Sequence, residues 1–244
     1  MAINIDNYDL SKYNDKNVLT NHPLMPSNCF RMIIAGGSGS GKTLLTTNMI
    51  LKYLNFDKLH IFAPSISQPT YLMLKDTFKK LDDERKRQVR EYNDTHKKLM
   101  RQPEPIATFS DSLNDFKLDD LDKKEQHLII LDDLILDKRQ DPMKELYVRG
   151  RHRNCSIIYL TQSYYTVPKI IRQNATSVIL FNPTSKRELT LLHRDVGQGV
   201  DLRPFVKTIE QALDERYSFV KVDIATNNRK LRFTSGFDKT LEFN

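Results

Sequence analysis

The chain of 244 residues has no tryptophan, only two cysteines and only eight glycines. Two cysteines, Cys29 and Cys155, can form neither a disulfide framework nor, by themselves, a four-ligand zinc site. No apolar run approaches the roughly 18 residues that a membrane-spanning helix needs. Residues 1–7 also lack the basic and apolar regions of a secretory signal. We therefore expect an intracellular protein without a metal cluster and without stable membrane insertion.

Positive charge is in excess and is unevenly distributed. Thirty-eight Lys and Arg residues oppose 31 Asp and Glu residues, which gives a formal net charge of +7. Residues 139–172 carry seven basic and two acidic side chains, and residues 75–101 carry ten basic and six acidic ones. Clustered basic charge suits a surface that binds a polyanion. In residues 75–101 the charges come in opposed blocks, which favours an exposed helix with ion pairs between its turns.

Short apolar runs alternate with helical patterns along the chain. The runs expected to form strands are residues 30–35, 58–63, 106–110, 126–131, 156–161 and 177–181. Apolar residues at helical spacing predict a helix over residues 42–54, and residues 69–101 predict one long or two shorter charged helices. This alternation predicts an α/β fold with a central, mostly parallel sheet flanked by helices. Residues 217–224 and 230–234 flank a polar turn and predict an antiparallel β-hairpin.

The same patterns suggest a division of the chain into three parts. Residues 1–29 are rich in Asn and Asp and are expected to form an extended arm. Residues 30–205 would form the core, and residues 206–244 a C-terminal extension that holds the hairpin.

A glycine-rich loop follows the first expected strand. Its residues, which fit the pattern G-x-x-x-x-G-K-[ST], are Gly36, Gly37, Ser38, Gly39, Ser40, Gly41, Lys42 and Thr43. Small residues let backbone N–H groups surround a phosphate, and the following helix presents its positive end to the same anion. We expect Lys42 to contact the β- and γ-phosphates of ATP and the Thr43 hydroxyl to hold Mg²⁺.

Two carboxylates follow the apolar strand at residues 126–131. In nucleoside triphosphatases the first acid at such a strand end holds the magnesium ion and its water shell, and this role falls to Asp132. Asp133 would act as the general base that polarises the attacking water. The alternative for both Asp132 and Asp133 is that they cap the next turn, and it has more weight for Asp133 because glutamate is the more usual base at the second position.

The strand at residues 156–161 ends in a Thr–Gln pair and is preceded by three arginines. If this strand lies beside the one that precedes the loop, Gln162 lies near the γ-phosphate, where its amide can sense phosphate or position water. A simple loop role for Gln162 is the alternative. The preceding arginines are Arg149, Arg151 and Arg153. They could enter a neighbouring subunit's site as an arginine finger, contact DNA phosphates, or form an exposed basic turn.

Together these residues resemble the FtsK–HerA superfamily of DNA-pumping ATPases. Within that superfamily the sequence is most similar to the genome-packaging ATPases of large double-stranded DNA viruses and virophages, of the poxvirus type. The segments that carry the resemblance are residues 26–43, 128–133, 150–162 and 167–181. The run from Gly150 and Arg151 to Thr161 and Gln162 is the discriminating part, since the glycine-rich loop is common to many families.

The resemblance implies an ASCE-type, RecA-like P-loop core with ATP bound between the subunits of a homo-oligomeric ring, a pentamer or hexamer. It implies translocation of double-stranded DNA into a preformed capsid, with ATP and Mg²⁺ as cofactors and capsid vertex proteins as further partners. The implied location is the host cytoplasm at virus assembly sites, with the virion as a second location. Arg151 takes the position of the family's Gly-Arg arginine, and which of the three arginines acts in trans is left open.

Three other functions are compatible with the same motifs. A helicase or translocase of this superfamily in replication or repair would separate DNA strands. A nucleoside or nucleotide kinase would transfer phosphate to a small acceptor without stimulation by DNA. In a non-hydrolysing assembly factor, bound ATP would be structural.

Overall fold

The computed structural model describes residues 19–96, 99–134, 141–183, 185–197, 199–226, 228 and 231–243. The strands are β1 (Arg31–Ala35), β2 (Lys58–Phe62), β3 (Ala107–Ser110), β4 (His127–Asp132), β5 (Cys155–Thr161), β6 (Ser177–Phe181), β7 (Phe219–Asp223), β8 (Phe233–Ser235) and β9 (Lys239–Thr240). The helices are α1 (Lys42–Lys52), α2 (Pro69–His96), α3 (Asp141–Arg149), α4 (Lys169–Asn174), α5 (Lys186–Val196) and α6 (Leu202–Ala212). Short 3₁₀ turns are η3 (Leu118–Asp120), η5 (Gly150–Arg153) and η6 (Tyr164–Thr166).

These strands form one sheet in the order β3-β2-β4-β5-β1-β6-β7-β8-β9. From β3 to β6 all neighbours are parallel, and β7, β8 and β9 continue the sheet in antiparallel pairs. The predicted α/β fold with a mostly parallel sheet is confirmed. Strand β5 lies between β1 and β4, with Tyr159 opposite both Ile33 and Leu131, so the carboxyl ends of the three strands lie side by side.

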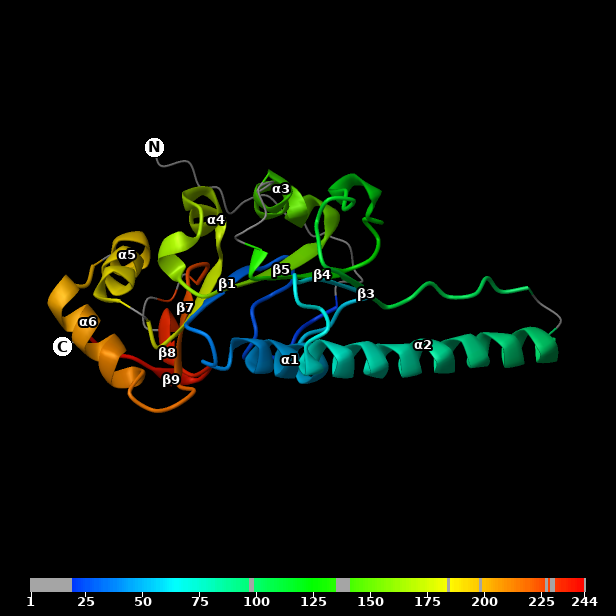
Figure 1. Ribbon diagram of the computed structural model, residues 1–244, viewed down its shortest axis with the longest axis horizontal. Coiled ribbons are helices and arrows are strands. Elements are labelled where there is room, and N and C mark those ends of the chain that lie inside the picture. The colour runs from blue at the N-terminus through cyan, green and yellow to red at the C-terminus, as the bar shows by residue number, and fades with distance from the viewer. Residues whose placement is uncertain are drawn as a thin grey trace, which may run out of the picture.

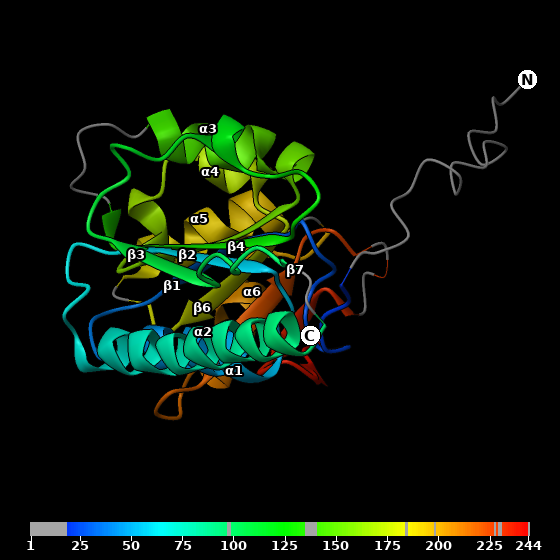
Figure 2. The same ribbon diagram turned by 90° about the vertical axis from the view of Figure 1, so that its right-hand side faces the viewer.

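Helices cover both faces of the sheet, which explains why its strands are apolar on both faces. Alternate residues of β1 enter different cores: Ile33 packs with residues of α3, α4, α5 and α6, whereas Met32 packs with residues of α1 and α2. Both side chains are fully buried. Figure 2 shows the sheet between α1 and α2 on one side and α3, α4 and α5 on the other.

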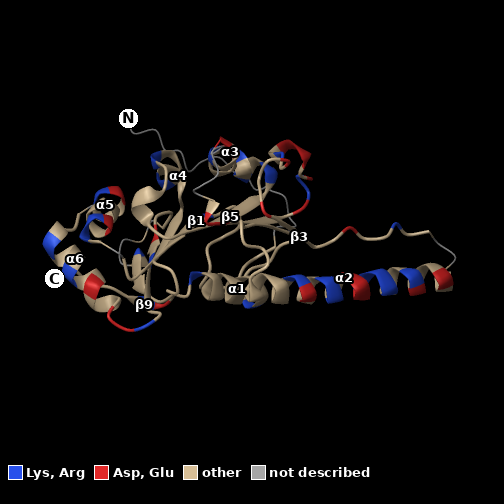
Figure 3. Cartoon of the chain, viewed as in Figure 1, with Lys and Arg blue, Asp and Glu red and all other residues tan. Residues whose placement is uncertain are grey.

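Helix α2 is a single helix of 28 residues that extends far beyond the sheet (Figure 1). Its buried side chains all lie in the first half, from Tyr71 to Asp82. In the second half Arg87 pairs with Glu84 and Glu91 on neighbouring turns, and positive and negative charges alternate along the rod (Figure 3). The expected exposed helix with ion pairs is confirmed.

The predicted antiparallel strands at the C-terminus are also present. Lys221 of β7 lies opposite Thr234 of β8, and a third strand, β9, pairs with β8. Strand β8 begins at Phe233, three residues later than expected, and residues 229–230 lie outside the described part of the chain. Helix α6 crosses the expected boundary at residue 205, and β7 joins the core sheet through β6. The division into domains stays a prediction.

Most of the expected N-terminal arm, residues 1–18, lies outside the described residues. Its remainder lies against the core, where the His22 amide donates to the Tyr53 carbonyl and Met25 is buried beside Phe30. Among the described helices, none combines the length and the apolar character needed to cross a membrane.

Candidate nucleotide-binding site

The glycine-rich loop joins β1 to α1 at the carboxyl edge of the sheet. Lys42 is the first residue of α1, and its ammonium donates to the carbonyls of Gly36 and Gly37 at 2.6 and 2.9 Å. Burial lowers the pKa of Lys42, and the carboxylates of Asp132 and Asp133 oppose that shift. The ammonium is therefore held over the loop by its carbonyls and close to both acids.

The shape of the loop requires glycine at two positions. Gly41 has a φ of +103°, in the left-handed region that favours glycine, and it directly precedes α1. A Cβ at Gly36 would lie 2.6 Å from the Cβ of Phe181. The buried Ser40 hydroxyl has no hydrogen-bond partner among the described residues. A tight loop at a helix N-terminus, with a buried hydroxyl available, fits a bound phosphate.

Asp132, the last residue of β4, is held by a residue from another element. The Tyr71 hydroxyl of α2 donates to Oδ2 of Asp132 at 2.5 Å, and both side chains are buried. Burial raises the pKa of Asp132, the bond from Tyr71 and the charge of Lys42 lower it, and Asp133 raises it. Burial and the same carboxylate raise the pKa of Tyr71, so its hydroxyl stays protonated and remains the donor.

Asp133 lies next to Gln162, as the strand order requires. The Gln162 side-chain amide donates to Oδ2 of Asp133 at 2.7 Å, and the Asp133 backbone amide donates to the Leu160 carbonyl at 3.1 Å. The amide fixes one carboxylate oxygen and leaves the other available as a proton acceptor.

These side chains line one cavity of about 360 Å³. Its lining residues are Ser38, Gly39, Lys42, Thr43, Ala63, Pro64, Ser65, Gln68, Asp132, Asp133, Thr161 and Gln162. The structure thus brings together Lys42, Thr43, both acids and Gln162. Sequence reasoning missed Ser65 and Gln68, although they follow β2, whose carboxyl end lies beside that of β4.

The oxygen atoms in this cavity fit a magnesium ion. The Thr43 hydroxyl and the carboxylates of Asp132 and Asp133 line it together, and hydroxyl and carboxylate oxygens suit this hard cation. Within the described chain, no group of three or more His, Cys, Asp or Glu residues could hold a metal ion by itself. A bound ion would therefore complete its shell with water and phosphate oxygens, as Mg²⁺ commonly does.

Two further cavities lie on the other side of the loop, and sequence reasoning did not foresee them. One, of about 200 Å³, is lined by Gly41, Leu44, Leu45, Asn48, Phe181, Tyr217 and Phe219. The other, of about 300 Å³, is lined by Gly39, Ser40, Phe181, Asn182 and residues 214–218. Tyr217 has a φ of +66° and is 52% exposed, so its ring stands beside the loop with one side open to solvent. Together the two cavities could take a flat, largely apolar group and its polar attachment.

The three arginines lie away from this cavity. They belong to α3 and η5, which precede β5 and therefore lie at the opposite edge of the sheet. Arg149 pairs with Glu145 and Asp119, and Arg153 pairs with Asp119. Arg151 is exposed and forms no ion pair within the described residues. From this edge the arginines could enter only the site of another subunit.

A family model described as "Poxvirus A32 protein" matches residues 17–228. The chain belongs to this family. The DNA packaging protein OPG160 of Monkeypox virus is 30% identical over 162 residues, which cover 63% of this chain and 48% of that protein. Its counterpart from Vaccinia virus (strain Copenhagen) has the same identity, with 53% of that protein covered. The chain thus spans about half the length of these relatives.

Solved structures share the fold. The genome packaging NTPase B204 of Sulfolobus turreted icosahedral virus 2, in complex with AMP, superposes with a TM-score of 0.51 at 17% identity. The match covers 84% of this chain and 95% of B204. The sulfate complex of the same protein also gives a TM-score of 0.51, at 16% identity. The expected P-loop fold and the resemblance to poxvirus-type packaging proteins are confirmed.

Proposed function

We propose that this protein is a Mg²⁺-dependent ATPase that moves double-stranded DNA during viral genome packaging. The observation that carries the proposal is the convergence of Lys42, Thr43, Asp132, Asp133 and Gln162 on one cavity beside a phosphate-binding loop. Membership in a family whose relatives are named DNA packaging proteins supports the DNA-moving part.

Each group that lines the cavity has its own role in the proposed hydrolysis. The loop amides and the N-terminus of α1 bind the phosphates, and Lys42 neutralises charge on the β- and γ-phosphates. Thr43 and Asp132 would hold Mg²⁺, which when bound withdraws charge from the transferred phosphoryl group. Asp133 accepts a proton from the attacking water. At the same time the water oxygen bonds to the γ-phosphorus, and the bond between the γ-phosphorus and the β–γ bridging oxygen breaks. Gln162 keeps the Asp133 carboxylate oriented through the hydrogen bond described above.

The two cavities beside Tyr217 are the proposed place for the adenine and ribose. Phe181, Tyr217 and Phe219 offer aromatic surface, and Asn182 offers an amide. Aromatic faces bind flat ring systems by offset stacking, worth roughly 0.5–1.5 kcal/mol per pair.

We further propose that the active form is a homo-oligomeric ring of five or six subunits in which Arg151 completes the site of a neighbour. Its exposure, its lack of an ion pair among the described residues and its position at the sheet edge opposite its own site support this assignment. In this scheme the ring binds capsid vertex proteins and moves DNA at virus assembly sites in the host cytoplasm.

The decisive experiment measures ATP hydrolysis with and without double-stranded DNA over a range of protein concentrations. We expect turnover that rises with concentration and with DNA, and that falls by about 10³-fold or more in Arg151→Ala. His152→Ala, an exposed change on the same turn, is the matched control and should retain turnover.

Other outcomes point to other functions. Turnover indifferent to DNA and to protein concentration would overturn the motor and favour a kinase. Strand separation would favour a helicase. An ATP-dependent activity that survives Asp133→Asn would favour an assembly factor in which ATP is structural.

A further inference from the structure

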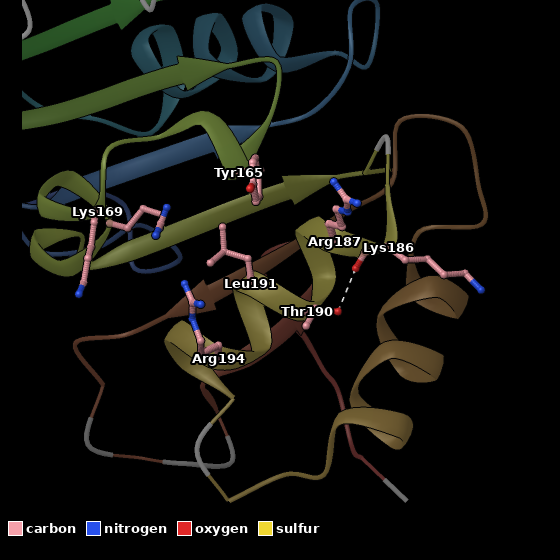
Figure 4. Close-up of a pocket in the computed structure, with 8 residues that line it drawn as sticks. Tyr165, Lys169, Lys186, Arg187, Thr190, Leu191 and Arg194 are labelled. Atoms are coloured by element: carbon pink, nitrogen blue, oxygen red, sulfur yellow. Dashed lines mark hydrogen bonds between the residues drawn. The ribbon is translucent and has the colours of Figure 1, made fainter.

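A second large cavity, of about 690 Å³, lies between η6 and α4 on one side and α5 on the other. The residues that line this basic groove are Tyr165, Lys169, Arg172, Lys186, Arg187, Thr190, Leu191 and Arg194. Five of these eight side chains are Lys or Arg. Figure 4 shows Tyr165 across the groove from α5, with Leu191 projecting from α5 into the space between the two and with Arg187 and Arg194 about two turns apart on that helix.

Little of the positive charge in the basic groove is neutralised within the described chain. Asp195 accepts from Nε of Arg172 at 2.9 Å and lies 3.8 Å from Arg194. The Arg172 side chain is only 8% exposed and also donates to the Val167 carbonyl, so it forms a fixed part of the wall. Within the described residues Lys169, Lys186 and Arg187 make no ion pair. Like Arg194, all three side chains are exposed.

We propose that the basic groove binds the sugar-phosphate backbone of double-stranded DNA, an inference that rests on the proposed function. Exposed cations on long side chains suit an extended polyanion better than a small anion, which needs an enclosed site. Arg187 and Arg194 are seven residues apart on α5, about 10 Å along the helix axis. That distance corresponds to about three phosphates of one DNA strand. The exposed Tyr165 hydroxyl adds a donor of the kind that contacts phosphates, whereas the Thr190 hydroxyl donates to the Lys186 carbonyl of its own helix.

The basic groove is also joined to the ATP site by a short path. Tyr165 follows Gln162 by three residues, and between them the Ser163 hydroxyl donates to the carboxylate of Glu188. Glu188 is a buried residue of α5, adjacent to Arg187. A DNA backbone bound to α5 would therefore be linked, through the hydrogen bond between Glu188 and Ser163, to the segment that carries Gln162.

The test removes three cations of the groove in the full chain, as Lys169→Ala, Arg187→Ala and Arg194→Ala together. Lys186 is left in place because its side chain extends away from the other cations (Figure 4). Binding of a fluorescein-labelled DNA duplex is measured by anisotropy at several salt concentrations. We expect the affinity at about 0.1 M salt to fall by roughly tenfold to several hundredfold, and the slope of log affinity against log salt to shrink by about 2.7.

Two companion variants separate charge from structure. Lys169→Arg, Arg187→Lys and Arg194→Lys together keep the charges and should bind DNA nearly as wild type, because backbone contacts need charge more than shape. Lys75→Ala, Lys79→Ala and Lys80→Ala together remove three exposed charges from α2 and should leave DNA binding and its salt slope almost unchanged. The thermal unfolding midpoint checks that each variant is folded.

Four results would overturn the proposal. If the groove variant binds DNA as wild type does, the groove is not the DNA site, although the proposed function survives. If it binds DNA normally but no longer oligomerises, the groove is a subunit interface. If the α2 variant loses as much affinity as the groove variant, binding follows net charge and not this groove. If wild type itself neither binds DNA nor is stimulated by it, the proposed function fails as well.

Discussion

The Tyr71 hydroxyl donates to Oδ2 of Asp132 at 2.5 Å, although 61 residues separate the two in the chain. Asp132 ends β4, and Tyr71 lies in the first turn of α2, so this bond ties the longest described helix to the carboxylate that would hold Mg²⁺. It occupies one carboxylate oxygen and leaves Oδ1 for the metal.

Tyr71→Phe should therefore weaken the magnesium site while leaving the ring packed in the core. Loss of a hydrogen bond to a buried charged group costs about 1.5–3 kcal/mol, so the magnesium concentration for half-maximal turnover should rise about tenfold or more. The bond from Tyr71 lowers the pKa of Asp132, so its removal should also move the acidic limb of the pH profile to higher pH. Tyr92→Phe, on the exposed part of α2, is the control. An unchanged magnesium dependence in Tyr71→Phe would show that the bond has no positioning role.

The rate of hydrolysis should depend on both Asp133 and the Gln162 amide that orients its carboxylate. Asp133→Asn removes the proton acceptor and should lower kcat by about 10²–10⁴-fold with ATP binding retained. Gln162→Glu places a second carboxylate 2.7 Å from the first, where the amide nitrogen now lies, and should lower kcat more than Gln162→Ala does because like charges repel. Single-turnover kinetics check the order, and equal losses in the two Gln162 variants would contradict it.

Ser163→Ala tests the path between the basic groove and the ATP site. The change removes the donor to Glu188 and so breaks the connection between α5 and the segment that carries Gln162. We therefore expect the ratio of DNA-stimulated to basal turnover to fall, while DNA affinity stays near that of wild type. Thr77→Ala, which removes a hydroxyl bonded only within α2, is the control. A full stimulation ratio in Ser163→Ala would mean that any coupling follows another route.

Tyr217→Ala should raise the KM for ATP severalfold with little change in kcat, because the ring would contact the base and not the reacting phosphates. Tyr217→Phe keeps the aromatic face and should restore the KM. Arg216, whose guanidinium lies 4.7 Å from the centroid of the Tyr217 ring, lines the same cavity, so the control is Tyr92→Ala, at an exposed tyrosine of α2. A wild-type KM in Tyr217→Ala would place the base elsewhere.

His60 predicts an acid-sensitive fold. Burial, with His127 and Lys58 nearby, lowers the pKa of His60 from 6.5 to about 4. The His60 imidazole therefore binds a proton more tightly in the unfolded chain than in the folded one. Its contribution to the free energy of unfolding is present above pH 6.5 and is lost as the pH falls towards 4. The total is on the order of 3 kcal/mol. Urea unfolding at pH 7.5 and pH 5 covers about 2 kcal/mol of this total, and His60→Gln should reduce the difference between the two free energies of unfolding; an equal difference in the variant would assign the effect to other groups.

The features that could be predicted from the sequence are those that depend on residues close together in the chain. The loop at residues 36–43, the acids at the end of β4 and the buried strands each depend on neighbouring residues, and the structure places them as expected. Gln162 was predictable once its strand was assumed to lie beside β1, which the strand order confirms.

Features that depend on distant segments were not predictable. Tyr71 meets Asp132 only because α2 packs on the sheet face beside β4, and Tyr217 reaches Gly41 only because β7 pairs with β6. The basic run at residues 139–172 separates in space: Arg149 and Arg153 pair with Asp119, whereas Lys169 and Arg172 line the basic groove with residues of α5. No linear count of charge could have joined Lys169 to Arg194.

Because α2 is long and is held near one end by Tyr71, a small tilt at that end becomes a larger displacement at the other. Twenty-eight helical residues make a rod of about 42 Å, pinned near one end to the acid that would bind the metal. Over that length a tilt of about 3° at the pinned end displaces the free end by about 2 Å. A small tilt of α2 at the candidate metal site would thus appear, at the far tip of the helix, as a displacement of about the radius of an atom.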